Sequence, residues 1–435
     1  MEKAFPVQEF EKPTKTSHAS VDGTTRATKK MNEMRFVKQA ILLTIITTTV
    51  LKTEAADLVL DTFDNISTWK QTRAGKIEVS EETGDKAMKL TAPGTATRTW
   101  NFSMDERYQL AKYQGLSFRV KGNGANLWDS ITVSGNGNWG WNYTCYFEIK
   151  GTDWQTIELA WDDFPAGEAL GGKKIGAPGA LTPVGIDTVA FGDRWTIGYG
   201  NNSIPQFSYL VDDLKLVEKV KPKTIEKYPL RQLADVITKM KSGQPVTIFC
   251  SGDSITAGSG VTAPQENSYG AKLQKELRKL YGNDKINVKT IAVGGAHSYD
   301  LRAWAERDFL GEKPDLVTLH IGYNDKSSGL PVEFFRASVS EYIDRVNSLT
   351  SGNSAFLLLS TIPGQGARFT MMDDYADAVR TLAAERNIAM YDLAADFKAL
   401  GTENMSVYFR DMAHPNNQGH DFIAKKLAAY FAAQK

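Results

Sequence analysis

The sequence of 435 residues predicts two domains of different fold class, an antiparallel β-sandwich followed by a three-layer α/β domain with a parallel sheet. The main observation is a change in apolar pattern. Short alternating runs fill residues 57–218, whereas buried apolar strands and amphipathic helices alternate over residues 229–435. Tryptophan is also unevenly spread, because eight of the nine lie between Trp69 and Trp195. We therefore expect two modules with different roles.

The chain before the first domain has the pattern of an export signal. Residues 1–33 are polar and lack apolar periodicity, so we interpret them as disordered or as an upstream extension. Residues 34–55 form a signal-peptide layout: a short basic lead, an apolar run over residues 39–51, and small residues at both cleavage-determining positions. That run is too short to anchor a mature protein in a membrane. The alternative to a signal peptide is a buried helix. We expect a secreted or periplasmic protein.

The strands of the first domain are predicted by period-two alternation, with Gly, Asn and Asp separating them at spacings of about ten residues. No helical stretch of useful length interrupts them. This spacing is typical of an antiparallel sandwich of the jelly-roll type. In chain order the runs are LVLDTF, KAMKLTA, ATRTWNF, GLSFRVKG, DSITVSG, CYFEIKG, QTIELAW, TVAFGD and SYLVDDLKLVE.

Two tryptophans in this domain are candidates for substrate binding. Trp139 and Trp141 alternate with Gly140, so on a strand both indoles project from one face. Two such rings form a platform on which the C–H faces of sugar rings can stack. The alternative is that both are core residues of the sandwich.

The opening DTFDN, the strand WQTIEL and the closing YLVDDLKLVE resemble carbohydrate-binding jelly rolls with a galactose-binding-like fold. In such domains carboxylates near the first and last strands often hold a structural calcium. The resemblance makes Asp61, Asp212 and Asp213 the matching candidates, and hard oxygen ligands suit that ion. Aspartates at strand ends that are merely solvated are the alternative.

Residues 219–228 mix charge with proline and lack an apolar period, which predicts a linker before the second domain, residues 229–435. A helical apolar spacing starts at Leu230 and stops at Gly243. Compact apolar runs then predict parallel strands covered on both faces, and segments with i, i+3, i+4 spacing predict the covering helices. The strands are PVTIFCSG, INVKTIAVGG, PDLVTLHIG, SAFLLLST and IAMYDLA, and the helices include SYGAKLQKELRKLYG, PVEFFRASVSEYIDRVNSL, YADAVRTLAAERN and a closing helix from about Asn417 to Phe431.

Chemically useful side chains follow these strands. The loops after the first three carry Ser254, Gly295 and Asn324, and RDMAHPNNQGH before the last helix carries Asp411 and His414. Because the carboxyl ends of parallel strands meet at one edge of a sheet, we expect these residues to gather there.

This set has the parts needed for acyl transfer. Ser254 would be the nucleophile, His414 would take its proton, and Asp411 would orient the imidazole. The N–H groups of Ser254 and Gly295 and the Asn324 amide would form the oxyanion hole. Asp253 is expected to brace the turn that presents Ser254.

The blocks GDSIT, VGGAHS, GYND and DMAHP, in this order, resemble the SGNH (GDSL-type) hydrolase family. The resemblance implies a serine hydrolase acting on ester bonds without a cofactor. Two departures are Ala296-His297, where many members carry Asp-Thr, and Ile255, where lipolytic members often carry Leu. His297 is therefore a candidate substrate contact or a loop histidine without a catalytic role. We interpret two further histidines as structural, His320 as a core histidine in a buried strand and His420 in the closing helix as a cap or packing residue.

The pairing of the two modules favours a secreted esterase that deacetylates a plant-type polysaccharide such as acetylxylan or acetylmannan. This step is an analogy with modular esterases. A lipase, thioesterase or peptidoglycan O-acetylesterase on the same fold remains an alternative. A carbohydrate-binding protein with an inactive hydrolase domain is another.

Several function classes are disfavoured by composition and motif. Lys plus Arg equals Asp plus Glu at 51 each, so nothing indicates a nucleic acid partner. The glycine-rich SGDSITAGSG lacks the lysine of a phosphate-binding loop. A glycoside hydrolase would need Asp253 and Asp325 as its carboxylate pair, and the serine and histidine would have no purpose.

Overall fold

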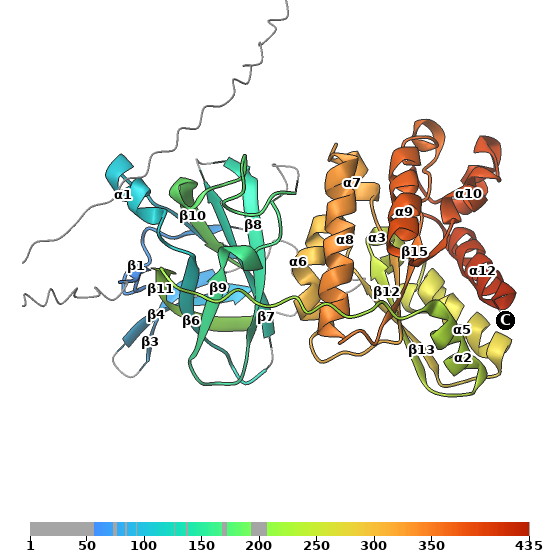
Figure 1. Cartoon of the computed structure of the whole chain (residues 1–435), viewed down its shortest axis with the longest axis horizontal. Coiled ribbons are helices and arrows are strands. Elements are labelled where there is room, and N and C mark those ends of the chain that lie inside the picture. Colours follow the sequence, from blue (N-terminus) through green and yellow to red (C-terminus); the bar gives the residue numbers. More distant parts are fainter. Residues whose placement is uncertain are drawn as a thin grey trace, which may run out of the picture. The chain divides into compact units, whose positions relative to one another are not determined.

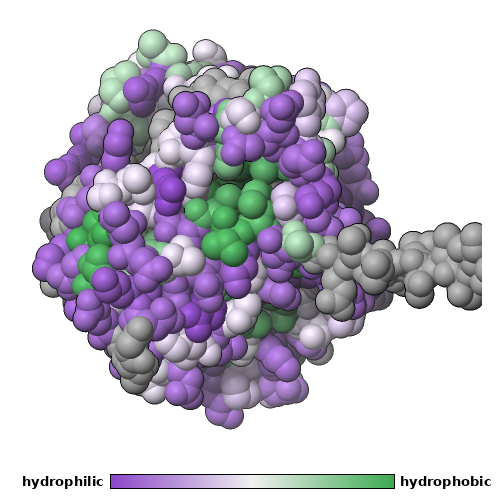
Figure 2. Space-filling view, turned by 90° about the vertical axis from the view of Figure 1, so that its left-hand side faces the viewer, coloured by the Kyte–Doolittle hydropathy of each residue, from purple (hydrophilic) through white to green (hydrophobic). Residues whose placement is uncertain are grey.

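The computed structural model describes residues 56–434, except 73–75, 83–84, 93, 126, 136–137, 168–171 and 193–206, with no side chains described at 72, 82 and 138–141 (Figure 1). The predicted extension (1–33) and signal peptide (34–55) lie outside the described residues, so both remain predictions. Within the described residues, no helix combines the length and apolar character needed to cross a membrane. Figure 2 shows a face that is mainly hydrophilic, with hydrophobic side chains gathered in separate areas.

The first domain consists of two antiparallel sheets (Figure 1). One has the strand order β3-β4-β11-β6-β9 with β1 paired to β11, and the other has the order β2-β5-β10-β7-β8. Their bounds are β1 (Leu58–Asp61), β2 (Lys70–Thr72), β3 (Lys76–Glu82), β4 (Asp85–Ala92), β5 (Thr95–Thr99), β6 (Gly115–Lys121), β7 (Leu127–Gly135), β8 (Asn138–Ile149), β9 (Gln155–Ala160), β10 (Ile186–Phe191) and β11 (Phe207–Val217).

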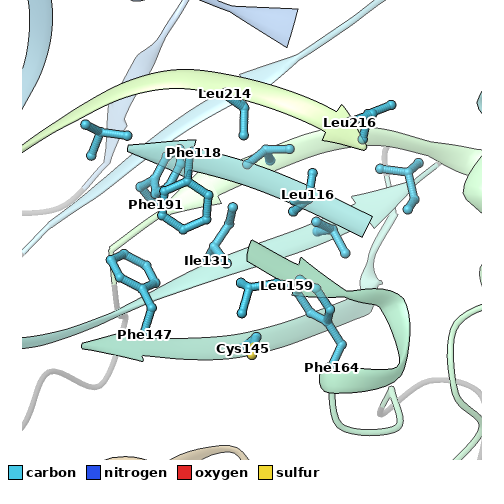
Figure 3. Close-up of a cluster of buried hydrophobic side chains, with 14 of the residues drawn as sticks. Leu116, Phe118, Ile131, Cys145, Phe147, Leu159, Phe164, Phe191, Leu214 and Leu216 are labelled. Carbon is cyan, nitrogen blue, oxygen red and sulfur yellow. The ribbon is translucent and has the colours of Figure 1, made fainter. Parts of the chain in front are cut away.

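The two sheets share one hydrophobic core, which Figure 3 shows in close-up. Leu116 and Phe118 of β6 meet Ile131 of β7 and Phe191 of β10, and the rings of Phe118 and Phe191 lie 5.1 Å apart between centroids. Inward-facing residues from both sheets bury each other, as in a sandwich. The predicted antiparallel fold class of this domain is confirmed.

One short helix of the first domain was not predicted. α1 (Met104–Leu110) starts at Ser103, whose hydroxyl accepts a hydrogen bond from the backbone N–H of Glu106, while the Glu106 carboxylate accepts from the N–H of Ser103. This reciprocal pair is a capping box, and its Ser-x-x-Glu spacing is visible in the sequence.

The second domain has a five-stranded parallel sheet in the order β13-β12-β14-β15-β16, as predicted. Helices cover both faces (Figure 1): Ile248 packs in the core formed with α2, α5 and α12, and its neighbour Phe249 packs in the core formed with α6, α8 and α9. The strands are β12 (Val246–Gly252), β13 (Ile286–Ala292), β14 (Leu316–His320), β15 (Ala355–Leu359) and β16 (Ala389–Tyr391). The helices are α2 (Leu233–Lys241), α3 (Ser254–Ala257), α4 (Pro264–Asn267), α5 (Tyr269–Tyr281), α6 (Ser298–Phe309), α7 (Tyr323–Ser327), α8 (Val332–Leu349), α9 (Asp373–Arg386), α10 (Leu393–Lys398), α11 (Met405–Tyr408) and α12 (Asn417–Ala433).

Residues 219–228, the predicted linker, have no helix or strand and run against the second domain. Asn347 in α8 donates a hydrogen bond of 2.6 Å to the carbonyl of Tyr228, and the N–H of Glu226 donates to the Ser348 hydroxyl at 2.8 Å. The segment is therefore fastened along α8.

Candidate active site

Ser254 is presented by the turn that follows strand β12. It is the first residue of α3, and the Asp253 side chain caps this helix by accepting a hydrogen bond of 2.9 Å from the N–H of Ile255. Such a cap satisfies a backbone donor that the first turn of a helix leaves unpaired. The predicted bracing role of Asp253 is confirmed.

The structure brings Ser254, His414 and Asp411 together, although Ser254 and His414 are 160 residues apart in sequence. Ser254 Oγ lies 3.0 Å from His414 Nε2, and His414 Nδ1 lies 2.9 Å from Asp411 Oδ2. Because a carboxylate only accepts hydrogen bonds, we assign the ring proton to Nδ1, which leaves the Nε2 lone pair to accept from the serine hydroxyl. This arrangement can activate Ser254 as a nucleophile.

The Asp411 carboxylate stays charged although its surroundings are partly buried. Partial burial works against the charge, but the N–H groups of Ala413 and His414 each donate a hydrogen bond of 2.8 Å to Oδ1 and the imidazole faces it. The net result holds the pKa of this carboxyl below its usual value. An ionised Asp411 can stabilise the imidazolium that forms when His414 accepts a proton.

The loop after β13 lies beside the serine. A Cβ added at Gly294 would lie 3.8 Å from Ser254 Cβ, and Gly295 has φ of +81°, a conformation that other residues rarely adopt. Asn324, in the short helix α7 that follows β14, donates a hydrogen bond of 2.8 Å from Nδ2 to the carbonyl of Ala296. An amide nitrogen carries two protons, so the second N–H of Asn324 remains to bind an oxyanion.

Two carboxylates lie buried behind this edge of the sheet. Asp325 accepts hydrogen bonds from the N–H and the hydroxyl of Ser298 at the start of α6, and burial raises its pKa to about 6. Burial also raises the pKa of Asp253 to about 7, and the charge of Asp325 adds to that effect. Both side chains are fully buried, so they brace loops and do not form the exposed pair that a glycoside hydrolase requires. The bracing role of Asp325 was missed by the sequence analysis.

His297, a candidate substrate contact, is occupied within the protein. Its Nδ1 lies 3.3 Å from Asp300 Oδ2, its Nε2 lies 2.9 Å from Ser328 Oγ, and its ring stacks on Tyr299 at 4.9 Å. The residue is buried at the N-terminus of α6. The geometry favours the alternative interpretation, a loop histidine that fixes local structure.

The other two histidines are core residues, as predicted. His320 Nε2 accepts a hydrogen bond from the N–H of Ile362, and His420 Nδ1 accepts from the N–H of Tyr269. Burial lowers the pKa of His320 to about 4 and that of His420 to about 3, so both are neutral.

The carboxylates of the first domain do not form the expected calcium site. Asp61 is ion-paired with Arg98 and accepts a hydrogen bond from the indole of Trp69, whereas Asp212 and Asp213 are paired with Arg119. Among the described residues, no group of three or more His, Cys, Asp or Glu could hold a metal. The contacts of these carboxylates therefore do not support the calcium assignment, because arginine already neutralises their oxygens, and a structural calcium stays a prediction.

Trp139 and Trp141, the expected sugar platform, lie in β8, but their side chains are outside the described residues. Their role as platform or as core remains a prediction.

Two comparisons by sequence found known proteins similar to part of this chain. Residues 250–422 match the model of the GDSL-like Lipase/Acylhydrolase family. A curated acetylxylan esterase from Geobacillus stearothermophilus is 27% identical over 209 residues, which cover 43% of this chain and 94% of the relative.

Two solved structures illustrate the likeness of the second domain. The crystal structure of Axe2, an acetylxylan esterase from Geobacillus stearothermophilus, is 23% identical with a TM-score of 0.38 and covers 43% of this chain and 94% of that chain. A two-domain esterase (CEX) active on acetylated mannans, co-crystallised with mannopentaose, is 22% identical with a TM-score of 0.39 and covers 46% of this chain and 53% of that chain. The second domain is therefore similar to the GDSL-like lipase/acylhydrolase family over residues 250–422, a match that begins within β12, the strand that leads to Ser254, and the protein is an ester-bond hydrolase.

Proposed function

We propose that this protein is a secreted carbohydrate acetylesterase that removes acetyl groups from an acetylated plant polysaccharide such as xylan or mannan. The observation that carries the proposal is the hydrogen-bonded series Ser254–His414–Asp411 at the carboxyl edge of the sheet. The similarity to an acetylxylan esterase supports the acetyl–sugar substrate class.

In the first half of the reaction, Ser254 Oγ attacks the acetyl carbonyl carbon while His414 Nε2 takes the hydroxyl proton. The carbonyl oxygen becomes an oxyanion, for which the N–H groups of Ser254 and Gly295 and the second Asn324 amide proton are the donors. His414 then gives its proton to the departing sugar oxygen. The C–O bond to the sugar breaks, and an acetyl-serine remains.

In the second half, a water molecule attacks the acetyl-serine and His414 takes one of its protons. Collapse of the oxyanion expels Ser254 Oγ, which recovers its proton from His414, and acetate leaves. Asp411 stays ionised throughout and stabilises the imidazolium in both halves. No cofactor takes part in these steps.

Small residues support an acetyl group as the acyl part of the substrate. The loop facing Ser254 consists of Gly294, Gly295 and Ala296, and the serine is followed by a single short helical turn. A small acyl group needs no extended apolar channel.

The test is acetate release from acetylated xylan, acetylated mannan, acetylated pectin and O-acetylated peptidoglycan, with Ser254→Ala as the control. We expect release from xylan or mannan by the wild-type protein and none by the variant. Hydrolysis of p-nitrophenyl esters that rises from acetate to octanoate would favour a lipase instead. Release from peptidoglycan alone would overturn the proposed substrate class.

A further inference from the structure

The segment that carries Asp411 and His414 lies outside the sheet and the helices that border the site. Residues 409–416 hold themselves together partly through the bridge between Phe409 and Pro415 and a hydrogen bond of 2.9 Å from the N–H of Arg410 to the His414 carbonyl. The segment is open to solvent, because half of the Asp411 side chain is exposed. The position of His414 Nε2 therefore depends on what fastens this segment to the rest of the domain.

A second loop, residues 363–368 after β15, provides that fastening. The backbone N–H of Gln365 donates a hydrogen bond of 3.0 Å to the carbonyl of Met412, and its side-chain Nε2 donates one of 2.7 Å to the carbonyl of Asp411. One residue thus holds two successive carbonyls of the catalytic segment. The approach is close, because a Cβ added at Gly364 would lie 2.4 Å from the Met412 oxygen.

Tyr323 adds a third contact at the same place. Its hydroxyl donates a hydrogen bond of 3.3 Å to the Met412 carbonyl and accepts one of 3.0 Å from Arg368. Tyr323 directly precedes Asn324, the proposed oxyanion donor. The contacts of Gln365 and Tyr323 therefore connect the histidine segment to the loop that binds the oxyanion.

From these contacts we propose that Gln365 is a positioning residue of the reaction, which keeps His414 Nε2 within hydrogen-bond distance of Ser254 Oγ. The proposal rests on the proposed function, because it assumes that Ser254 and His414 react. Gln365 binds backbone carbonyls of the catalytic segment, and it acts on the reaction through the placement of His414. Proton transfer needs donor and acceptor within about 3 Å, so a small displacement slows both halves of the reaction.

The experiment compares Gln365→Ala and Gln365→Glu in the full chain with p-nitrophenyl acetate as substrate. Ala removes the side-chain donor, and Glu keeps its length but turns an oxygen toward the Asp411 carbonyl. We expect Gln365→Ala to lower kcat about 10-fold with KM within about twofold, and Gln365→Glu to lower kcat further. Inactivation by phenylmethylsulfonyl fluoride, which reports the nucleophilicity of the serine, should slow in parallel.

The matched control is Gln232→Ala. Gln232 is another glutamine whose Nε2 donates to a backbone carbonyl, that of Leu230, but it lies at the start of α2. This variant should keep the wild-type kcat. A wild-type kcat in Gln365→Ala, with an unchanged melting temperature, would overturn the proposal.

If the melting temperature of Gln365→Ala lies far below that of the wild type, Tyr323→Phe provides the test instead. This change removes only the hydroxyl that donates to the Met412 carbonyl. It should lower kcat about two- to fivefold without a large change in KM, and an unchanged kcat would count against the proposal. The proposed function fails separately, if Ser254→Ala retains activity.

Discussion

The two domains use carboxylates in opposite ways. In the first domain, the Asp61 and Asp212 side chains are 6% and 3% exposed and each is paired with an arginine. In the second, the Asp411 side chain is 50% exposed and its partner, His414, is 29% exposed. A buried pair with a permanent cation holds strands together, whereas an open pair with a titratable imidazole can exchange protons with a substrate. The partner and the exposure of an aspartate thus decide its role.

The largest expected effect is the loss of ester hydrolysis when Ser254, the serine beside the exposed Asp411–His414 pair, is replaced. Replacing Ser254 by Ala removes the nucleophile, so hydrolysis of p-nitrophenyl acetate should fall by roughly 10⁴-fold or more. Circular dichroism and the melting temperature should match those of the wild type. Retained turnover would mean that this edge of the sheet is not where the ester is cleaved.

Replacing Asn324 by Ala tests the oxyanion hole. The variant loses one donor to the oxyanion and also the hydrogen bond to the Ala296 carbonyl. Loss of one such donor typically lowers kcat by about 10²–10³-fold. The measurement is kcat and KM with p-nitrophenyl acetate. A rise in KM with unchanged kcat would show that Asn324 binds the ground state and has no special role in the transition state.

Breaking the buried pair of the first domain should affect stability but not chemistry. Arg98→Ala leaves the Asp61 carboxylate without its cation, and the free energy of unfolding of this domain should fall by about 3 kcal/mol in denaturant titrations. Hydrolysis of a soluble ester should not change. The control is Lys76→Ala, which breaks an exposed pair with Glu78 and should have a much smaller effect on the free energy of unfolding. Equal effects of the two variants would contradict the contrast between the buried and exposed pairs.

The smallest expected effect concerns the buried Asp253. Its pKa of about 7 in the folded state lies above the value of about 3.9 for an exposed aspartate. The resulting stabilisation is therefore present below about pH 4 and is lost as the pH rises to about 7. Asp253→Asn cannot titrate, so the free energy of unfolding of the wild type relative to the variant should fall between pH 4 and pH 8.

Denaturant unfolding at pH 4, 6 and 8 measures this difference. The buried histidines are the same in both proteins, so their contribution cancels in the comparison. Parallel pH profiles for the two proteins would show that Asp253 titrates as an exposed group does.

The second domain was the easier one to predict from sequence. Its apolar runs identify parallel strands, and the residues that follow parallel strands lie at one edge of the sheet. The sequence therefore predicted that Ser254, Asn324 and His414 lie close together. The sequence could not predict the positioning role of Gln365. That role depends on how the irregular loop after β15 packs against the backbone of the segment that carries His414. The bracing role of Asp325 could not be predicted for the same reason, because it depends on a contact with Ser298, which is distant in sequence.

Two predicted roles depended on contacts that the sequence does not show. The position of Asp61 at a strand end fits calcium as well as it fits an arginine, and Arg98 reaches it from β5, a strand of the other sheet. Likewise, His297 was a candidate substrate contact because Ala296-His297 stands where many members of the resembling family carry Asp-Thr, but Ser328 and Asp300 occupy its ring nitrogens. Long-range partners decided both cases.

The proposed mechanism depends most on the formation of an acetyl-enzyme intermediate at Ser254. The direct measurement is peptide mass spectrometry of the enzyme quenched in acid during turnover of p-nitrophenyl acetate. We predict an acetyl group on the peptide that contains Ser254, present in the wild type and absent in Ser254→Ala. Steady release of acetate with no acetylated serine peptide at any quench time, together with activity in Ser254→Ala, would contradict the account.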